Sequence, residues 1–162
     1  MRNRGHAVLV LAAGIAACSA TTHPGAAPTP APMFVGYSEL RWGRIIPELG
    51  ASSPEIAILR VDPTTQATDL MIRTPAAIHV RRHWHSANET HTMIRGTAVF
   101  ACDGRQATLG PGSFNFMPAK MVHEAWLPAD SLTFITVDRA WDIHWIEGPS
   151  TAADLNVTPP PR

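Results

Sequence analysis

The residues of this chain best suited to chemistry lie in one short stretch, HWHSANE, which begins at His83. In a β-strand, residues i and i+2 face the same side, so His83 and His85 point one way and Trp84 points the other. Glu89 follows after a short polar break, and His123 is a further imidazole downstream. Imidazole and carboxylate donors suit divalent first-row metal ions, from zinc through iron and manganese. The spacing therefore predicts a metal site.

Strand alternation places other residues on the same side as these donors. His91 lies two residues after Glu89, and Met93 two residues further on, so both are expected beside the metal or in its pocket. His91 is a candidate fifth ligand or proton carrier, and the alternative is a hydrogen-bonded histidine of the wall. His79 has the same parity as His83 and is expected in the core or at its rim.

Aromatic residues near the donors offer a second kind of contact. Trp126 lies close to His123 in sequence and is a candidate pocket residue on which a substrate could stack. The alternative is packing in the core, which aromatic side chains dominate. Phe114 and Phe116 are expected to form apolar wall.

Between residues 38 and 148, short apolar or alternating runs recur without a helical period, and turn sequences such as Asp62-Pro63 and Asp103-Gly104 separate them. We predict strands at Glu55–Val61, Thr68–Arg73, Ile78–His85, Glu89–Arg95, Thr97–Cys102, Gln106–Leu109, Ser113–Met117, His123–Leu127, Leu132–Val137 and Trp141–Ile146. Many short strands with hardly any helix predict an all-β antiparallel sandwich or small barrel, inside which alternate residues can converge.

These residues also resemble two motifs of the cupin superfamily. The first motif matches His83-x-His85-x3-Glu89-x6-Gly96, and the second matches Gly112-x5-Pro118-x-Lys120-x2-His123. The chain departs from the second motif at Lys120, where the family usually has glycine, and at Leu127, where asparagine is common. Over residues 38–148 the chain looks most similar to small exported single-domain cupins of unassigned function. It is similar, more distantly, to the cupin half of zinc-binding anti-sigma factors.

The resemblance implies a double-stranded β-helix, or jelly-roll barrel, in which His83, His85, Glu89 and His123 hold one divalent metal ion. The identity of the ion is open among Zn, Mn, Fe, Ni and Cu. Such a ligand set leaves room on the ion for water or substrate, whereas structural zinc sites are closed. We therefore expect a metalloenzyme of the oxygenase (dioxygenase) or isomerase type that acts on a small polar molecule. The alternative is a non-catalytic ligand- or metal-sensing module.

The N-terminal residues have the features of an export signal. Arg2 and Arg4 precede an apolar run at residues 7–17, which is too short to span a bilayer. The sequence IAAC, which ends at Cys18, resembles the bacterial lipobox, so Cys18 is the expected lipidation site of a periplasmic, membrane-anchored lipoprotein. The alternative is ordinary signal-peptidase cleavage just after, at Cys18-Ser19-Ala20, which would release a soluble secreted protein.

The expected domain organisation is a signal peptide at residues 1–18, a Pro/Ala/Thr-rich linker at 19–37, a cupin domain at 38–148 and a disordered tail at 149–162. The formal net charge is zero and no basic run occurs, so no nucleic-acid partner is predicted. The expected partners are a small-molecule ligand and, through the lipid anchor, a membrane. Formation of a homodimer is left open. Cys102 has no intrachain partner once Cys18 is lipidated or removed, so no disulfide is expected.

Overall fold

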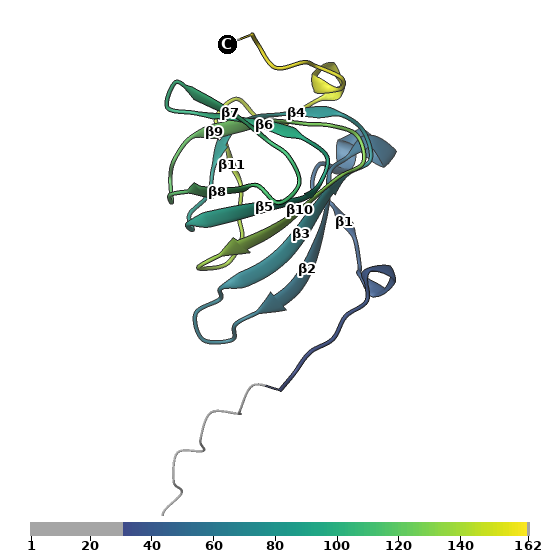
Figure 1. Ribbon diagram of the computed structural model, residues 1–162, viewed down its shortest axis with the longest axis vertical. Coiled ribbons are helices and arrows are strands. Elements are labelled where there is room, and N and C mark those ends of the chain that lie inside the picture. The colour runs from purple at the N-terminus through teal and green to yellow at the C-terminus, as the bar shows by residue number, and fades with distance from the viewer. Residues whose placement is uncertain (1–30, 162) are drawn as a thin grey trace, which may run out of the picture. The chain divides into compact units, whose positions relative to one another are not determined.

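The computed structural model describes residues 31–161 (Figure 1). The predicted signal peptide, the lipobox cysteine Cys18 and most of the predicted linker lie outside the described residues. The elements below all belong to one compact unit, Phe34–Arg162. Among the described residues, no helix is long and apolar enough to cross a membrane.

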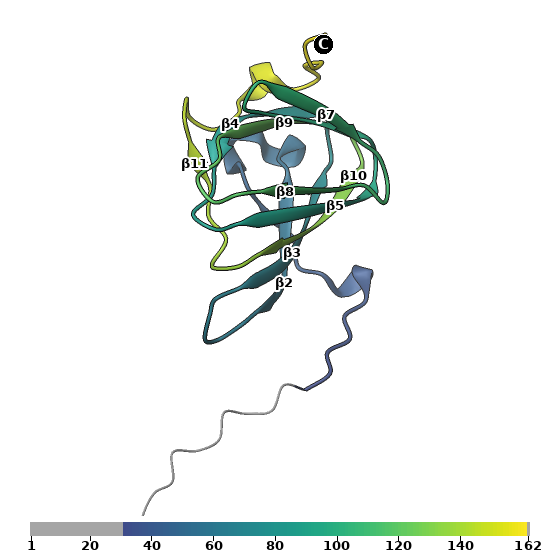
Figure 2. The same cartoon turned by 60° about the vertical axis from the view of Figure 1, so that its left-hand side comes forward.

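The strands form two antiparallel sheets that face one another (Figures 1 and 2). Sheet A has the strand order β1-β2-β3-β10-β5-β8, and sheet B has the order β11-β4-β9-β6-β7. The strands are β1 Gly43–Arg44, β2 Glu55–Val61, β3 Thr68–Thr74, β4 Ile78–Trp84, β5 Glu89–Arg95, β6 Ala98–Cys102, β7 Arg105–Leu109, β8 Phe114–Met117, β9 His123–Leu127, β10 Ser131–Val137 and β11 His144–Trp145. Short 3-10 helices lie at η1 Tyr37–Glu39, η2 Pro47–Ser52 and η3 Ala152–Asp154.

The predicted strands agree closely with those of the structure. The bounds of β2, β5 and β9 are as predicted, and most others differ by one residue at an end. The exception is the predicted strand Trp141–Ile146, of which only β11 is paired. Asp142 does not continue this strand because its backbone oxygen and its carboxylate bind His85 and Ser86 instead. Neither β1 nor the 3-10 helices are among the elements predicted from the sequence.

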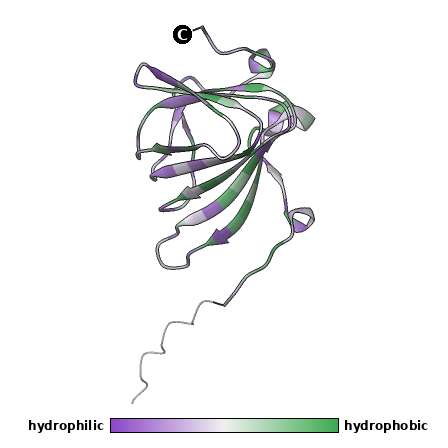
Figure 3. Cartoon of the chain, viewed as in Figure 1, coloured by the Kyte–Doolittle hydropathy of each residue, from purple (hydrophilic) through white to green (hydrophobic). Residues whose placement is uncertain are grey.

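The core lies between the two sheets, where alternate residues of each strand point inward. One cluster contains Leu70, Ala87, Ile135 and Val137, and the other contains Met93, Ala98, Phe100, Met117 and Ala125. Figure 3 shows hydrophobic and hydrophilic residues mixed along the strands of both sheets, as this alternation requires. Burial of each large apolar side chain contributes about 1.5–3 kcal/mol to folding.

A β-bulge in β4 changes which of its residues face inward. Val80 pairs with Ala125 and His83 pairs with His123, so three steps along β4 match two along β9. The extra residue reverses the alternation between the two pairs. Val80 therefore shares the inner face with His83, and the expectation that His79 lies on that face is wrong.

The C-terminal residues differ from the predicted disordered tail. Ser150 and Asp154 are buried, and Leu155 forms a β-bridge with Ile78. The Ser150 hydroxyl donates to the backbone oxygen of His79 at 2.9 Å, and Asp154 pairs with Arg81 at 2.8 Å. Because these polar contacts anchor the segment to β4, residues 150–156 are ordered although their sequence lacks an apolar period.

Candidate metal centre

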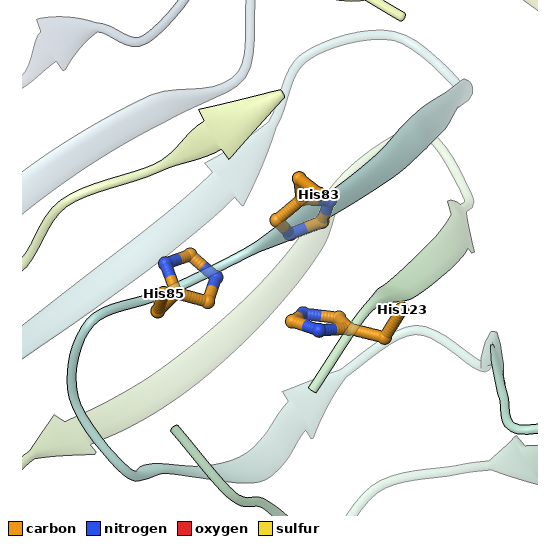
Figure 4. A group of neighbouring side chains, drawn as sticks. All are labelled: His83, His85 and His123. Atoms are coloured by element: carbon orange, nitrogen blue, oxygen red, sulfur yellow. The ribbon is translucent and has the colours of Figure 1, made fainter. Parts of the chain in front are cut away.

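Three histidines from two neighbouring strands converge between the sheets (Figure 4). His83 belongs to β4, His85 follows directly after it, and His123 opens β9. One ring nitrogen of each lies within 4.8 Å of the corresponding atoms of the other two, and all three residues are buried. The hydrogen-bonded register between β4 and β9 sets this arrangement, because it places His83 directly opposite His123.

Each of these rings is oriented by a hydrogen bond on its outer nitrogen. His83 donates from Nδ1 to the backbone oxygen of Arg81 at 2.7 Å, and His123 donates from Nδ1 to that of Met121 at 3.0 Å. A carbonyl oxygen can only accept, so the proton is on Nδ1 and the lone pair of Nε2 faces inward. This is the orientation in which a histidine can bind a metal.

His85 lies beyond the end of β4 and is held by a loop from the other end of the domain. Its Nδ1 donates to the backbone oxygen of Asp142. The Asp142 carboxylate accepts from the amide of Ser86 at 2.8 Å, and the backbone oxygen of His85 accepts from the amide of Lys120. Lys120 has φ 65°, so it forms in the left-handed region the turn for which the family usually has glycine. The departure at Lys120 therefore leaves the position of His85 intact.

Glu89 brings a carboxylate to the same cluster. Its Oε2 lies 3.2 Å from Nε2 of His85 and 3.9 Å from Nε2 of His123. Only 2 % of Glu89 is exposed, and no hydrogen bond reaches this oxygen from the described residues. A buried carboxylate oxygen without a donor is costly unless a cation compensates it. The unpartnered oxygen and the inward nitrogen lone pairs thus fit a bound divalent cation.

The electrostatics of the cluster keep two of its imidazoles neutral. Burial lowers the pKa of His83 to about 2, with neighbouring His123 as the next cause. Burial also lowers the pKa of His123 to about 4, although its bond to Met121 and the nearby Glu89 oppose the shift. Both rings are therefore unprotonated at neutral pH and can donate their Nε2 lone pairs to a metal.

His91 also faces this cluster, as alternation along β5 predicts. Its Nε2 lies 3.3 Å from Oε2 of Glu89, and its Nδ1 forms a 2.6 Å hydrogen bond with Oδ1 of Asn115. Asn115 lies opposite His91 in the β5–β8 register. Asn115 is not among the site residues predicted from the sequence, although its place between Phe114 and Phe116 puts it on the opposite face of the strand from both.

None of the aromatic residues Phe114, Phe116 and Trp126 lines the cavity. Phe114 and Phe116 are 62 % and 53 % exposed on the outer side of β8, because Asn115 and Met117 take the inner side. Trp126 alternates with Ala125, which faces the cavity, and stacks on His79 with ring centroids 4.5 Å apart. Trp126 is therefore not a pocket residue.

Met93 is buried, but it packs in the apolar core cluster with Phe100 and Met117 and does not line the cavity at the centre. The barrel is filled by side chains at this level, so inward parity alone does not place a residue in the pocket.

The cavity at the centre is small and mostly apolar. Its volume is about 70 Å³, enough for roughly five water molecules. Its polar part is formed by His83, His85, Glu89, His91, His123 and Thr133, and no lysine or arginine of the described chain lines it. Its apolar wall includes Ile45, Ile72, Phe100, Leu127, Ile135 and Trp145.

The comparisons with known proteins agree with this architecture. The family of AraC-like ligand-binding domains matches residues 70–156, more than half of the chain. The chain belongs to this family. The family match confirms the predicted cupin superfamily, and the two-sheet barrel confirms the predicted jelly-roll fold class. No curated protein matches the chain.

Solved structures similar to this AraC-like domain share its fold at low sequence identity. KdgF from Halomonas sp. is 18% identical, with a TM-score of 0.56 over 67% of this chain and 96% of that protein. An RmlC-like cupin from Shewanella frigidimarina NCIMB 400 is 17% identical, with a TM-score of 0.57 over 68% of this chain and 93% of its own. An acetylacetone dioxygenase from Acinetobacter johnsonii is 18% identical, with a TM-score of 0.55 over 69% and 77% of the two chains.

Proposed function

We propose that this protein is a metal-dependent cupin whose cavity binds a small molecule at one divalent ion held by His83, His85, Glu89 and His123. The observation that carries the proposal is the buried, unpartnered Oε2 of Glu89 among inward-facing imidazole nitrogens. When bound there, such an ion would polarise a carbonyl group or lower the pKa of a water molecule. The reaction class that we propose is that of an oxygenase or isomerase.

The protein's own residues restrict what can reach the ion. The apolar wall excludes a heavily hydroxylated ligand, because its hydroxyl groups would lose hydrogen bonds to water without finding partners. The absence of lysine and arginine among the described lining residues disfavours a ligand with a charged group distant from the metal. We therefore refine the expected small polar molecule to a compact one with a single polar head and an apolar body.

Metal analysis of the protein, purified without a histidine tag, is the first test. We expect close to one equivalent of a divalent metal, and none in the His83→Ala/His123→Ala variant. Oxygen uptake by the Fe(II)-loaded protein with a panel of small carbonyl and carboxylate compounds then tests the oxygenase class. Proton exchange next to a carbonyl, followed by NMR in deuterated water, tests the isomerase class. Equal metal content in the wild type and the double variant would refute the site.

A second candidate function is a binding module without turnover. The family match favours it, because the matching family is described as a ligand-binding domain. A metal-loaded protein that shows ligand-dependent thermal shifts, yet converts no compound in either assay, would identify this function.

We also propose that the protein is an exported, membrane-anchored lipoprotein, on the grounds of the lipobox-like sequence that ends at Cys18. Labelling of expressing bacteria with a palmitate analogue tests this proposal. We expect label on the wild type and none on Cys18→Ala, with Cys102→Ala as the matched control that keeps the label. Unlabelled wild-type protein in the culture medium or periplasm would instead support the soluble secreted form.

A further inference from the structure

The orientation of His91 is the same as that of the three histidines at the centre. Each of those three donates its Nδ1 proton to a backbone oxygen and turns Nε2 inward. The Nδ1 of His91 meets Oδ1 of Asn115 at 2.6 Å. An amide oxygen can only accept, so the His91 proton is on Nδ1 and its Nε2 carries a lone pair.

This lone pair faces the oxygen that the other imidazoles surround. Nε2 of His91 is 3.3 Å from Oε2 of Glu89, and Nε2 of His85 is 3.2 Å from the same atom. No hydrogen bond forms at either contact. Lone pairs that face a carboxylate oxygen repel it unless a cation lies between them. The position of His91 is therefore explained by the same cation that the rest of the centre requires.

Burial of the Asn115 amide costs free energy, which its hydrogen bond to His91 offsets. It points inward from β8, and its Nδ2 is buried without a hydrogen-bond partner. An apolar residue at this position would avoid the desolvation penalty of the amide. The hydrogen bond that Asn115 makes is the one that fixes the ring of His91, so its evident structural role is to hold that ring.

We propose that His91 is a fifth protein ligand of the metal and that Asn115 holds it in the ligating orientation. The inference rests on the metal site proposed above. Five protein donors leave one position on a six-coordinate ion, whereas four leave two. A small molecule that binds this ion therefore does so through a single atom. A chelating compound, which binds through two atoms, must first displace a protein ligand.

Proton NMR of the full chain loaded with Co(II) tests the proposal independently of activity. Every histidine bound to Co(II) through Nε2 shows a strongly shifted Nδ1 proton that disappears in deuterated water. We expect four such signals in the wild type and three in His91→Leu. Because outer contacts of metal ligands contribute about 10–100-fold to affinity, Asn115→Leu should weaken Co(II) binding at least about 10-fold and shift or broaden the signal of His91 alone.

His79→Gln is the matched control, since His79 lies on the outer face of β4 and should leave all four signals in place. Three signals in the wild type, with Co(II) affinity unchanged in His91→Leu and Asn115→Leu, would overturn the inference while leaving the metal site standing. A wild-type protein that binds no Co(II), Zn(II) or Fe(II) would overturn the proposed function itself. If His91→Leu does not fold, the signal count of the wild type and the Asn115→Leu titration still decide the question.

Discussion

Two clusters of histidine and carboxylate residues lie on opposite faces of β4 and β9, and they satisfy their polar atoms in different ways. On the inner face, Oε2 of Glu89 touches imidazole nitrogens but accepts no hydrogen bond. On the outer face, His79 meets Glu124 at 2.8 Å, and Asp154 accepts from Arg81 at 2.8 Å and from the amide of Thr151 at 2.7 Å.

The difference separates a binding site from a structural contact, although both clusters contain the same residue types. The outer carboxylate of Asp154 has its donors already. Burial alone would raise the pKa of Asp154, but Arg81 and Thr151 outweigh it and lower that pKa. The inner cluster has acceptors that face each other, and a single added cation would satisfy them together. Unpaired acceptors at the centre, and not the number of histidines, therefore support the proposed metal site.

The largest effect is expected from removing two inner ligands. His83→Ala/His123→Ala should reduce metal affinity by more than the 10–100-fold typical of an outer contact, to the point of no measurable occupancy. The outer double variant His79→Ala/Glu124→Ala should retain the metal. Isothermal titration with Zn(II) and Co(II) measures both, and loss of metal from the outer variant would contradict the comparison.

Stability of the metal-free protein should depend on pH through the inner histidines. The pKa values of His83 and His123 are lowered to about 2 and about 4 from 6.5. The unfolded chain therefore binds more protons than the folded one as pH falls below 6.5, and the free energy of unfolding decreases from there towards pH 4. Each histidine contributes at most about 1.4 kcal/mol per pH unit.

Urea unfolding at a series of pH values measures this slope. The His83→Ala/His123→Ala variant should have a flatter profile over the same range, because its titrating side chains are gone. Profiles of equal slope for the two proteins would argue against neutral, buried histidines in the folded state.

Isosteric amides should have opposite effects in the two clusters. Glu89→Gln removes a buried negative charge and supplies an N–H donor to the facing nitrogens, so the metal-free protein should gain about 1–3 kcal/mol of stability while losing metal affinity. Asp154→Asn should cost about 1 kcal/mol by weakening the contacts to Arg81 and Thr151, with metal affinity unchanged. Thermal unfolding with and without Zn(II) tests the pair. A destabilised, metal-free Glu89→Gln protein would show that Glu89 has a structural role.

The smallest effect is expected at the outer histidine. His79→Gln loses the stacking on Trp126 and part of the contact with Glu124, which together stabilise the fold by about 1 kcal/mol. Metal content should stay at the wild-type value, as measured by elemental analysis of the purified variant. A drop in metal content would indicate that the two faces of β4 are coupled.

Much of the fold followed from local patterns. Alternation and turn residues predicted both ends of β2, β5 and β9 correctly, because the side chains of a half-buried strand alternate between its two faces. The same rule failed where the two-residue period was broken, or where apolar residues faced outward and a polar residue faced inward. Because of the bulge in β4, His79 lies on the outer face. In β8 the two phenylalanines face outward and Asn115 faces His91.

The sequence by itself determined the proposed donor set and the superfamily, since the spacing of His83, His85 and Glu89 and the distant His123 are properties of the chain. Only the tertiary structure decided which residues support these histidines and which line the cavity. Asn115 and Asp142, which bind His91 and His85, and the apolar wall come from strands and loops far apart in sequence, and tertiary contacts rather than local pattern bring them together. A register depends on contacts between strands, so the companions of a metal site cannot be derived from the strand that carries it.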